Sequence, residues 1–260
     1  MLDAEPTLAP AAPLPTPTYM DAWKRRAIMW FGRAVRHSLS AVIARYSLVG
    51  DPPIFANAQF PWIKHLEDNW QAIRAEADSI TQHKDDVPAL VAISPDHKGI
   101  SDKKWKSFFL WGYGYRIDEN CARAPQTAAL LDKVPGLQSA FFSIMDPGAH
   151  LVPHRGVTKA IFTTHLGFRV PHAAERCWMT VDGQKLTWRE GDAFAFDDTY
   201  EHEVRNQTNE DRVILLLHVK RPVRFPGSLL ADFCLWGVRK SPFIQDALKN
   251  LEDWNSGVRA

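Results

Sequence analysis

The second half of the chain is a series of short β-type segments, and this pattern limits the choice of fold most. From about Leu137 onward, runs of apolar and β-branched residues alternate with turn residues, at 139–145, 149–154, 159–170, 177–181, 184–188, 192–197 and 212–219. Between two of these runs stands Asp182-Gly183, which predicts a two-residue hairpin because both central positions of a type I′ turn need positive φ. So many short strands within about eighty residues predict a barrel or jelly roll.

The first half is expected to be helical in part. Residues 1–18 are rich in proline and alanine and read as a disordered arm. Tryptophan and alanine recur at helical spacing from Asp21 to about Tyr46, and apolar residues recur in steps of four and three from Pro61 to Ile80. A strand ending in a glycine-bounded turn is expected at Trp105–Tyr115, and a short helix at Ala122–Leu131. The expected organisation is an arm at 1–18, a basic amphipathic helical segment at 19–50, a catalytic domain at 51–222 and a C-terminal helical extension at 223–260.

Basic residues gather on the first helical segment. Six lysines and arginines and the single acid Asp21 lie between residues 21 and 46. This is the pattern of an amphipathic helix on an anionic bilayer, so residues 19–46 are a candidate for peripheral membrane contact. The apolar residues Leu229, Leu230, Phe233 and Trp236, followed by Arg239 and Lys240, support such contact. The alternative is that the basic helix packs on its own domain.

Charge and cysteine content exclude several classes of protein. Lysine and arginine number 31 against 30 for aspartate and glutamate, so no nucleic-acid partner is expected. Cys121, Cys177 and Cys234 are far apart and lack metal-type spacing, which fits a reducing compartment without disulfides. The sequence shows neither a run of eighteen apolar residues nor a signal-peptide pattern. The expected location is cytoplasmic, with peripheral contact on the inner face of the membrane as an option.

Histidines and one arginine carry the chemistry in the strand-rich half. A barrel brings distant strands together, so His154 and His202 are expected to face each other across its mouth. Imidazole suits iron, zinc and copper alike, so the histidines alone do not name the metal. Arg212 opens the last long apolar run, where a guanidinium suits the distal carboxylate of an oxo acid chelated to the metal. This is the layout of a 2-oxoglutarate oxygenase.

These motifs resemble the aspartyl/asparaginyl β-hydroxylase family in order and spacing over roughly residues 50–222. The matching segments are His154-Arg155-Gly156, His165 to Pro171, Phe196 to Val204, Asp211-Arg212-Val213 and Arg221-Pro222, with softer matches at Phe60-Pro61-Trp62, Leu110 to Gly114 and Pro135-Gly136-Leu137. The resemblance implies a mainly β fold with helices: a double-stranded β-helix, jelly-roll or cupin-like, flanked by N-terminal helices. This agrees with the strand pattern.

The same resemblance implies the roles of the site residues. His154 and His202 would hold Fe(II), with 2-oxoglutarate and O2 as cosubstrates. Ser143 and Arg212 would bind the distal carboxylate of 2-oxoglutarate, and His165 would contact its end nearer the metal. His150 and His218 are expected to be structural on strand parity, and Asp197 and Asp198 to shape the turn that presents His202.

Two positions depart from common patterns. Most iron(II)/2-oxoglutarate enzymes have a carboxylate two residues after the first histidine, where this chain has Gly156. In this respect it resembles the aspartyl/asparaginyl hydroxylases rather than the lipid-hydroxylating relatives. Thr163 stands where the animal aspartyl hydroxylases have a cosubstrate-binding arginine, and Arg155, Lys159 or Arg169 are the candidates to compensate.

The expected activity is hydroxylation of an unactivated C–H bond. The first hypothesis is β-hydroxylation of an aspartyl or asparaginyl residue in a peptide, or of a free amino acid. The second is hydroxylation of a membrane-lipid acyl chain, of the lipid A or ornithine-lipid type. The third is a non-catalytic barrel that binds a small acid or a metal.

Overall fold

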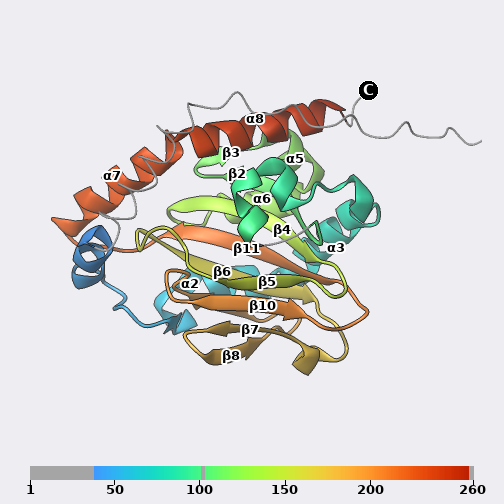
Figure 1. Ribbon diagram of the computed structural model, residues 1–260, viewed down its shortest axis with the longest axis horizontal. Coiled ribbons are helices and arrows are strands. Elements are labelled where there is room, and N and C mark those ends of the chain that lie inside the picture. The colour runs from blue at the N-terminus through green and yellow to red at the C-terminus, as the bar shows by residue number, and fades with distance from the viewer. Residues whose placement is uncertain (1–37, 101–102, 258–260) are drawn as a thin grey trace, which may run out of the picture.

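Two antiparallel sheets face each other in the computed structural model, which describes residues 38–100 and 103–257 (Figure 1). The large sheet has the spatial order β1 (Ile54–Phe55), β9 (Ala193–Phe196), β6 (Ile161–Arg169), β11 (Arg212–Lys220), β4 (Leu137–Met145), β2 (Trp105–Gly112) and β3 (Tyr115–Arg116). The small sheet has the order β5 (His150–His154), β10 (His202–Asn206), β7 (Cys177–Val181) and β8 (Gln184–Thr187).

Strands β4 to β11 form the barrel. Apart from the β7–β8 hairpin they alternate between the sheets along the chain, with β4, β6, β9 and β11 in the large one and β5, β7, β8 and β10 in the small one. This alternation is the arrangement of a double-stranded β-helix, so the predicted fold class is confirmed. The predicted hairpin is present as well, because Asp182 and Gly183 both have positive φ.

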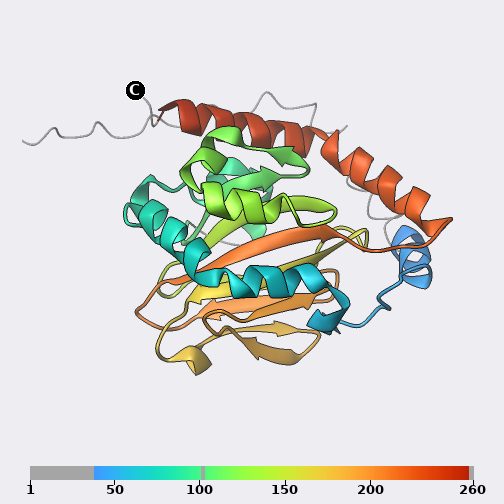
Figure 2. The same cartoon turned by 180° about the vertical axis from the view of Figure 1, so that it is seen from behind.

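Helices cover the outer face of the large sheet and one end of the barrel. They are α2 (Pro61–Asp68), α3 (Trp70–Thr81), α4 (Leu90–Ile93), α5 (Asp118–Arg123), α6 (Pro125–Leu131), α7 (Gly227–Arg239) and α8 (Pro242–Gly257), with 3-10 turns at Asn57–Gln59, Lys84–Asp86, Pro95–Gly99 and Ala174–Arg176. Figure 2 shows α2 and α3 crossing the back of the large sheet, while α7 and α8 run along its edge. None of the helices in the described ranges is long and apolar enough to cross a membrane.

Alternation along β11 separates two hydrophobic cores. Val213, Leu215 and Leu217 pack with the helices outside the large sheet. Ile214 and Leu216 point the other way, into the barrel, where they meet residues of the small sheet. Because successive side chains point to opposite faces, Arg212 and His218 share the barrel face with Ile214 and Leu216. Strand β11 therefore contributes apolar side chains to both cores and polar side chains to the barrel interior.

The sequence missed one strand. None of the expected strands includes residues 202–206, but His202–Asn206 forms β10, paired on both sides within the small sheet. Only one of its three buried positions, Val204, is apolar; the other two are His202 and Asn206. The Asn206 side chain donates to the backbone carbonyls of Met145 and Glu210, so its burial is compensated by hydrogen bonds. A strand whose interior side chains are polar gives no apolar alternation to detect.

Two of the predicted helices are present, each divided into two. The helix expected from Pro61 to Ile80 is broken at Asn69 into α2 and α3. The short helix expected at Ala122–Leu131 is the pair α5 and α6. Residues 38–45 are helical, whereas most of the basic segment at 19–50 and the arm at 1–18 lie outside the described residues.

Candidate active site

His154 and His202 lie opposite each other at the mouth of the barrel, as predicted. They end β5 and begin β10, and they are direct partners in the pairing of these two strands. Their ring centroids are 4.1 Å apart. The register shifts between His202 and Val204, and such a bulge re-aims the side chains next to it. Pro153 is tolerated there because β5 is the edge strand of the small sheet.

Each of the two rings is oriented by a backbone carbonyl. The Nδ1 atom of His154 is 2.7 Å from the carbonyl oxygen of Val152, and that of His202 is 3.0 Å from the carbonyl oxygen of Tyr200. A hydrogen bond from Nδ1–H leaves Nε2 with its lone pair. Burial lowers the pKa of both histidines, that of His202 to about 4. Both imidazoles are therefore neutral at physiological pH, which is the form that binds a metal.

No third protein ligand completes the pair. Among residues 38–100 and 103–257 no group of three histidine, cysteine or acidic side chains is placed to hold a metal. Gly156 brings its backbone close to Asp198, with its N–H donating to the Asp198 carbonyl at 2.7 Å. A Cβ atom at position 156 would overlap the Asp198 carboxylate. A residue larger than glycine, including the aspartate of the usual triad, therefore does not fit unless Asp198 moves.

The two adjacent aspartates have different roles. Asp197 accepts hydrogen bonds from the backbone N–H and the hydroxyl of Thr199, so its predicted role in shaping the turn is confirmed. The same prediction is wrong for Asp198, whose side chain lies in the cavity instead. Burial and the charge of Asp197 raise the pKa of Asp198 to about 7.

Arg212 occupies the deep end of the cavity. It is almost completely buried, its Nη2 donates to Ser143 Oγ at 3.1 Å, and its guanidinium lies 4.7 Å from the Trp188 ring. Burial lowers its pKa to about 10, so it stays charged. The neighbouring Asp211 pairs with Lys84 instead. Among the described side chains no carboxylate pairs with this cation, which fits a site for the carboxylate of a bound acid.

Ser143 and His165 lie next to this arginine, as expected. Ser143 Oγ also accepts a hydrogen bond from Trp105 Nε1 at 2.9 Å. His165 Nδ1 accepts from Trp188 Nε1 at 3.3 Å. Burial, with the nearby positive charge of Arg212, lowers the pKa of His165 well below its usual value. Its Nε2 therefore carries the proton and can donate to a cosubstrate.

Neither Lys159 nor Arg169 supplies the positive charge that an arginine would provide at position 163. Lys159 pairs with Asp197 at 2.8 Å, and Arg169 pairs with Asp78 outside the barrel. Of the three candidates, only Arg155 lines the cavity. The buried hydroxyl of Thr163 lies next to Asp198 and carries no positive charge.

His218 is a cavity residue that the sequence reasoning missed. Its assignment as structural on strand parity is wrong, because it lies six residues after Arg212 on the same face of β11. Its neighbours across the strands are Ser139 and Thr163. Burial lowers the pKa of His218 to about 4, and its Nδ1 lacks a partner within the described residues. Its even separation from Arg212 on the same strand would have placed it on the face that Arg212 shares.

The cavity continues from the histidines toward the helices. Its volume is about 230 Å³. The residues of α4, α7 and α8 that line it are all aliphatic: Leu90, Ile93, Leu235, Val238, Ile244, Ala247, Leu248 and Leu251. One cavity is therefore lined by the buried cation Arg212, by the two imidazoles and by these aliphatic side chains, which we call the aliphatic compartment.

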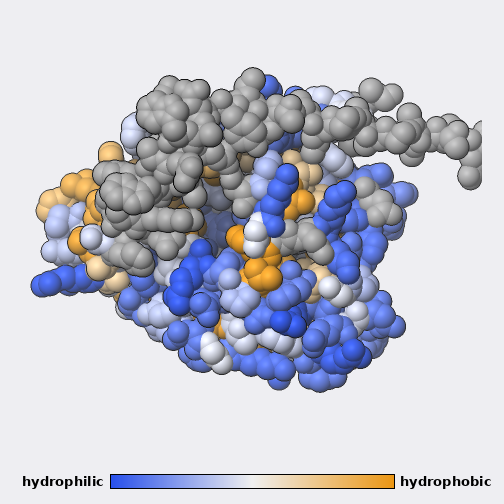
Figure 3. Space-filling view, in the orientation of Figure 1, coloured by the Kyte–Doolittle hydropathy of each residue, from blue (hydrophilic) through white to orange (hydrophobic). Residues whose placement is uncertain are grey.

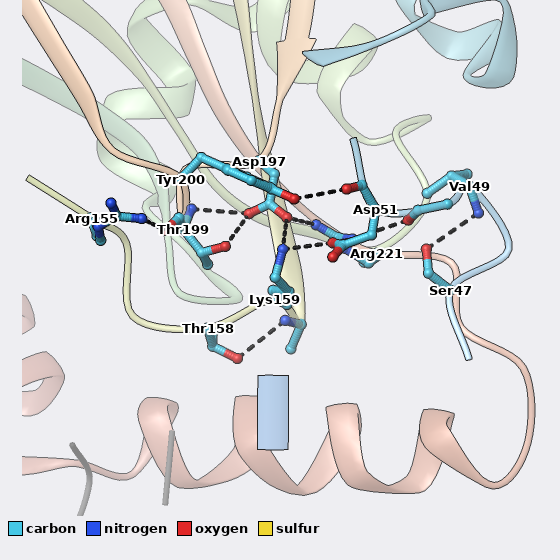
Figure 4. A network of polar contacts seen from close by, with 12 residues as sticks. Ser47, Val49, Asp51, Arg155, Thr158, Lys159, Asp197, Thr199, Tyr200 and Arg221 are labelled. Carbon is cyan, nitrogen blue, oxygen red and sulfur yellow. Dashed lines mark hydrogen bonds and ion pairs between the residues drawn. The ribbon is translucent and has the colours of Figure 1, made fainter. Parts of the chain in front are cut away.

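A buried ionic network holds the loop between β9 and β10 (Figure 4). Asp197 and Arg221 are fully buried and form an ion pair. Lys159 bridges Asp197 and Asp51 at 2.8 and 2.6 Å, and its ammonium lies 4.4 Å from the Tyr200 ring. The loop begins at Asp197 and ends at His202. The network therefore fixes the segment that carries both Asp198 and one imidazole.

Comparison with known proteins identifies the family. The sequence model of the aspartyl/asparaginyl beta-hydroxylases matches residues 67–222. The protein belongs to the aspartyl/asparaginyl β-hydroxylase family. It is thus a member of a family of hydroxylases, and the matched region contains all five predicted site residues.

Two relatives of this hydroxylase have different substrates in their names. An ornithine lipid ester-linked acyl 2-hydroxylase of Rhizobium tropici is 36% identical, over 94% of this chain and 84% of that protein. The human aspartyl/asparaginyl beta-hydroxylase is 34% identical, over 63% of this chain but only 22% of its own length. A prolyl-4-hydroxylase structure from Pseudomonas putida aligns at 18% identity with a TM-score of 0.37, covering 58% of this chain and 87% of that one.

Substituting Arg221 tests the network. Arg221→Met leaves Asp197 buried with only Lys159 as its cationic partner, so we expect a loss of roughly 3 kcal/mol in unfolding free energy at pH 7. Burial alone would raise the pKa of Asp197, but Arg221 and Lys159 outweigh it and hold the pKa below its usual value. The stabilisation is thus present above pH 4 and is lost as the pH falls through the native pKa. Urea unfolding at pH 7 and pH 3 measures this difference, and an equal loss at both values would contradict it.

Substituting Asp198 should raise the free energy of unfolding, whereas substituting Arg221 lowers it. The raised pKa of Asp198 means that the native state binds the extra proton between about pH 4 and 7, so the metal-free protein loses stability as the pH rises through this window. Asp198→Asn should therefore be more stable than the wild type at pH 8, by roughly 2–4 kcal/mol, and equal to it at pH 4. Urea unfolding in EDTA tests this. A variant that is less stable at pH 8 would refute the assignment.

Proposed function

We propose that the protein is an iron(II)- and 2-oxoglutarate-dependent dioxygenase that hydroxylates the acyl chain of a membrane lipid. Three features support the cofactor assignment. The His154 and His202 imidazoles are neutral, oriented and adjacent. Arg212 is a buried cation without a carboxylate partner among the described residues. The family consists of hydroxylases.

Each residue of the site has a role in this proposal. His154 and His202 would hold Fe(II) through their Nε2 atoms. Arg212 and Ser143 would bind the distal carboxylate of 2-oxoglutarate, and the Nε2–H of His165 would donate to its other end. Iron with 2-oxoglutarate and O2 supplies an oxidant strong enough for an unactivated C–H bond. The side chains position both substrates and exclude bulk water from the reacting atoms.

The aliphatic compartment is the observation that carries the choice of substrate. Leu235 and Val238 of α7, together with residues of α4 and α8, extend the cavity beyond the histidines with an apolar lining. An acyl chain buries its surface favourably against these aliphatic side chains, whereas burying a charged aspartyl side chain against them is costly. The similarity to the Rhizobium lipid hydroxylase spans 94% of the chain, so it extends beyond the family match and takes in α7.

β-Hydroxylation of an aspartyl or asparaginyl residue is the second candidate. It is favoured by Gly156, the feature that the sequence shares with the aspartyl hydroxylases proper, and by the similarity to the human enzyme. The polar row of Ser139, His218 and Thr163 would suit a peptide amide as well as a lipid carbonyl. The third option, a non-catalytic barrel for a small acid, would need Arg212 but not the two histidines.

Anaerobic titration of the metal-free protein with Fe(II) and 2-oxoglutarate tests the cofactor assignment. We expect the weak visible charge-transfer band of an iron-bound oxo acid in the wild type, and its loss in His154→Ala and His202→Ala. Arg212→Ala should still show the band but need roughly a hundredfold more 2-oxoglutarate, because a charged hydrogen bond in a buried site is lost. Easy loss of iron on purification is also expected, since only two protein ligands hold it.

His150→Ala is the matched control, because His150 lies on β5 near His154 but pairs with Glu203. It should leave the band unchanged. Absence of the band in the wild type, together with 2-oxoglutarate binding that does not depend on metal, would favour the non-catalytic barrel. Full turnover after EDTA treatment would also refute the proposal.

A further inference from the structure

The outward face of α7 is apolar although nothing in the described part of the chain covers it. Four large side chains on or just before this helix are mostly exposed: Phe225 at 74%, Leu229 at 62%, Phe233 at 65% and Trp236 at 58%. The three on the helix, Leu229, Phe233 and Trp236, recur at steps of four and three, so they form one stripe along it, and Phe225 lies just before its start. The rings of Phe233 and Trp236 stack at 5.9 Å. Figure 3 shows hydrophobic side chains gathered at the end of the molecule where α7 lies.

The opposite face of α7 is apolar too, but it is covered. Ala231 is fully buried in a small core with Ile43 and Ala160. Leu235 and Val238 line the cavity. Helix α7 therefore separates the aliphatic compartment of the cavity from the exterior. A helix at the surface of a domain normally has polar side chains on its outer face, so the apolar outer face of α7 indicates a contact site.

Charged groups frame the stripe in the way an anionic surface requires. Arg224 precedes the helix and Lys240 follows it, and both are exposed. Asp232, the only acid of α7, forms an ion pair with Lys220. The stripe thus has basic residues at both ends and a neutralised acid between them. Amphipathic helices that lie in the headgroup region of a membrane have this composition, with aromatic and leucine side chains on the buried face.

We infer that the exposed face of α7, formed by Phe225, Leu229, Phe233 and Trp236, docks the enzyme on an anionic lipid bilayer. This rests on the proposed function, because a lipid substrate is present in that bilayer. With α7 lying in the membrane surface, Leu235 and Val238 on its other face are next to the acyl chains, and the cavity opens beside its substrate. The helix serves as both membrane contact and cavity wall, so the acyl chain moves between two apolar surroundings without crossing water.

Co-sedimentation with vesicles of phosphatidylglycerol and phosphatidylcholine in equal parts tests this surface, using the full chain. We expect the wild type to bind, and the double variant Phe233→Ser/Trp236→Ser to bind at least roughly tenfold more weakly. Gln184→Ser/Thr187→Ser, on exposed positions of β8 at the far end of the molecule, is the control and should bind like the wild type. Circular dichroism should show the same fold in all three proteins. Pure phosphatidylcholine vesicles should bind the wild type more weakly, because Arg224 and Lys240 lose their anionic partners.

Hydroxylation of lipid dispersed in detergent separates this inference from the proposed function. The Ser double variant should lose vesicle binding but keep its turnover of dispersed lipid, because Phe233 and Trp236 do not line the cavity. No vesicle binding by the wild type, or equal binding by wild type and variant, would overturn the inference. So would a wild-type dimer that the same variant dissociates, since a second copy would then cover α7. Vesicle binding without lipid turnover would leave the docking surface standing and refute only the proposed substrate.

Discussion

The pairing of β5 with β10 is the constraint on which the site depends. It sets His154 opposite His202, and backbone carbonyls on the same two segments orient both rings. A shift of either strand by one residue would turn its imidazole away from the cavity, since neighbouring positions point to opposite faces of a strand. The ionic network around Asp197 and Arg221 fixes the loop that leads into β10. The geometry of the histidine pair is thus determined by backbone pairing and a buried ion pair more than by contacts between the two side chains.

Polar groups in the barrel interior are placed by strand parity. On β11, Arg212 and His218 point inward with Ile214 and Leu216 between them. Arg212 has no carboxylate partner among the described residues, and the Nδ1 of His218 has no hydrogen-bond partner there either. Buried polar groups left in this state are costly unless a ligand or water meets them. The cavity therefore combines the charge of Arg212, polar groups along β11 and aliphatic side chains from the helices.

The sequence predicted the parts of this fold that follow from apolar periodicity. The long strands and the helices at 61–80 were recognisable because their buried faces are apolar, and the five site residues followed from the family resemblance. Strand β10 was missed because His202 and Asn206 occupy buried positions normally filled by apolar side chains. The inward position of Asp198 was missed as well, because only the backbone approach of Gly156 creates the space for it. Neither feature leaves a signal in the apolar pattern, because both depend on contacts with other segments of the chain.

Product analysis tests the central claim most directly. The iron-loaded protein would be incubated with 2-oxoglutarate, O2 and an equimolar mixture of an ester-linked acyl lipid and a peptide that contains aspartate and asparagine. Mass spectrometry would then locate any added oxygen atom. The account predicts one oxygen on the lipid acyl chain, dependent on 2-oxoglutarate, and an unchanged peptide. Oxygen on the β-carbon of the aspartate or asparagine, with the lipid unchanged, would contradict the lipid assignment and make the aliphatic compartment a structural feature without a role in substrate choice.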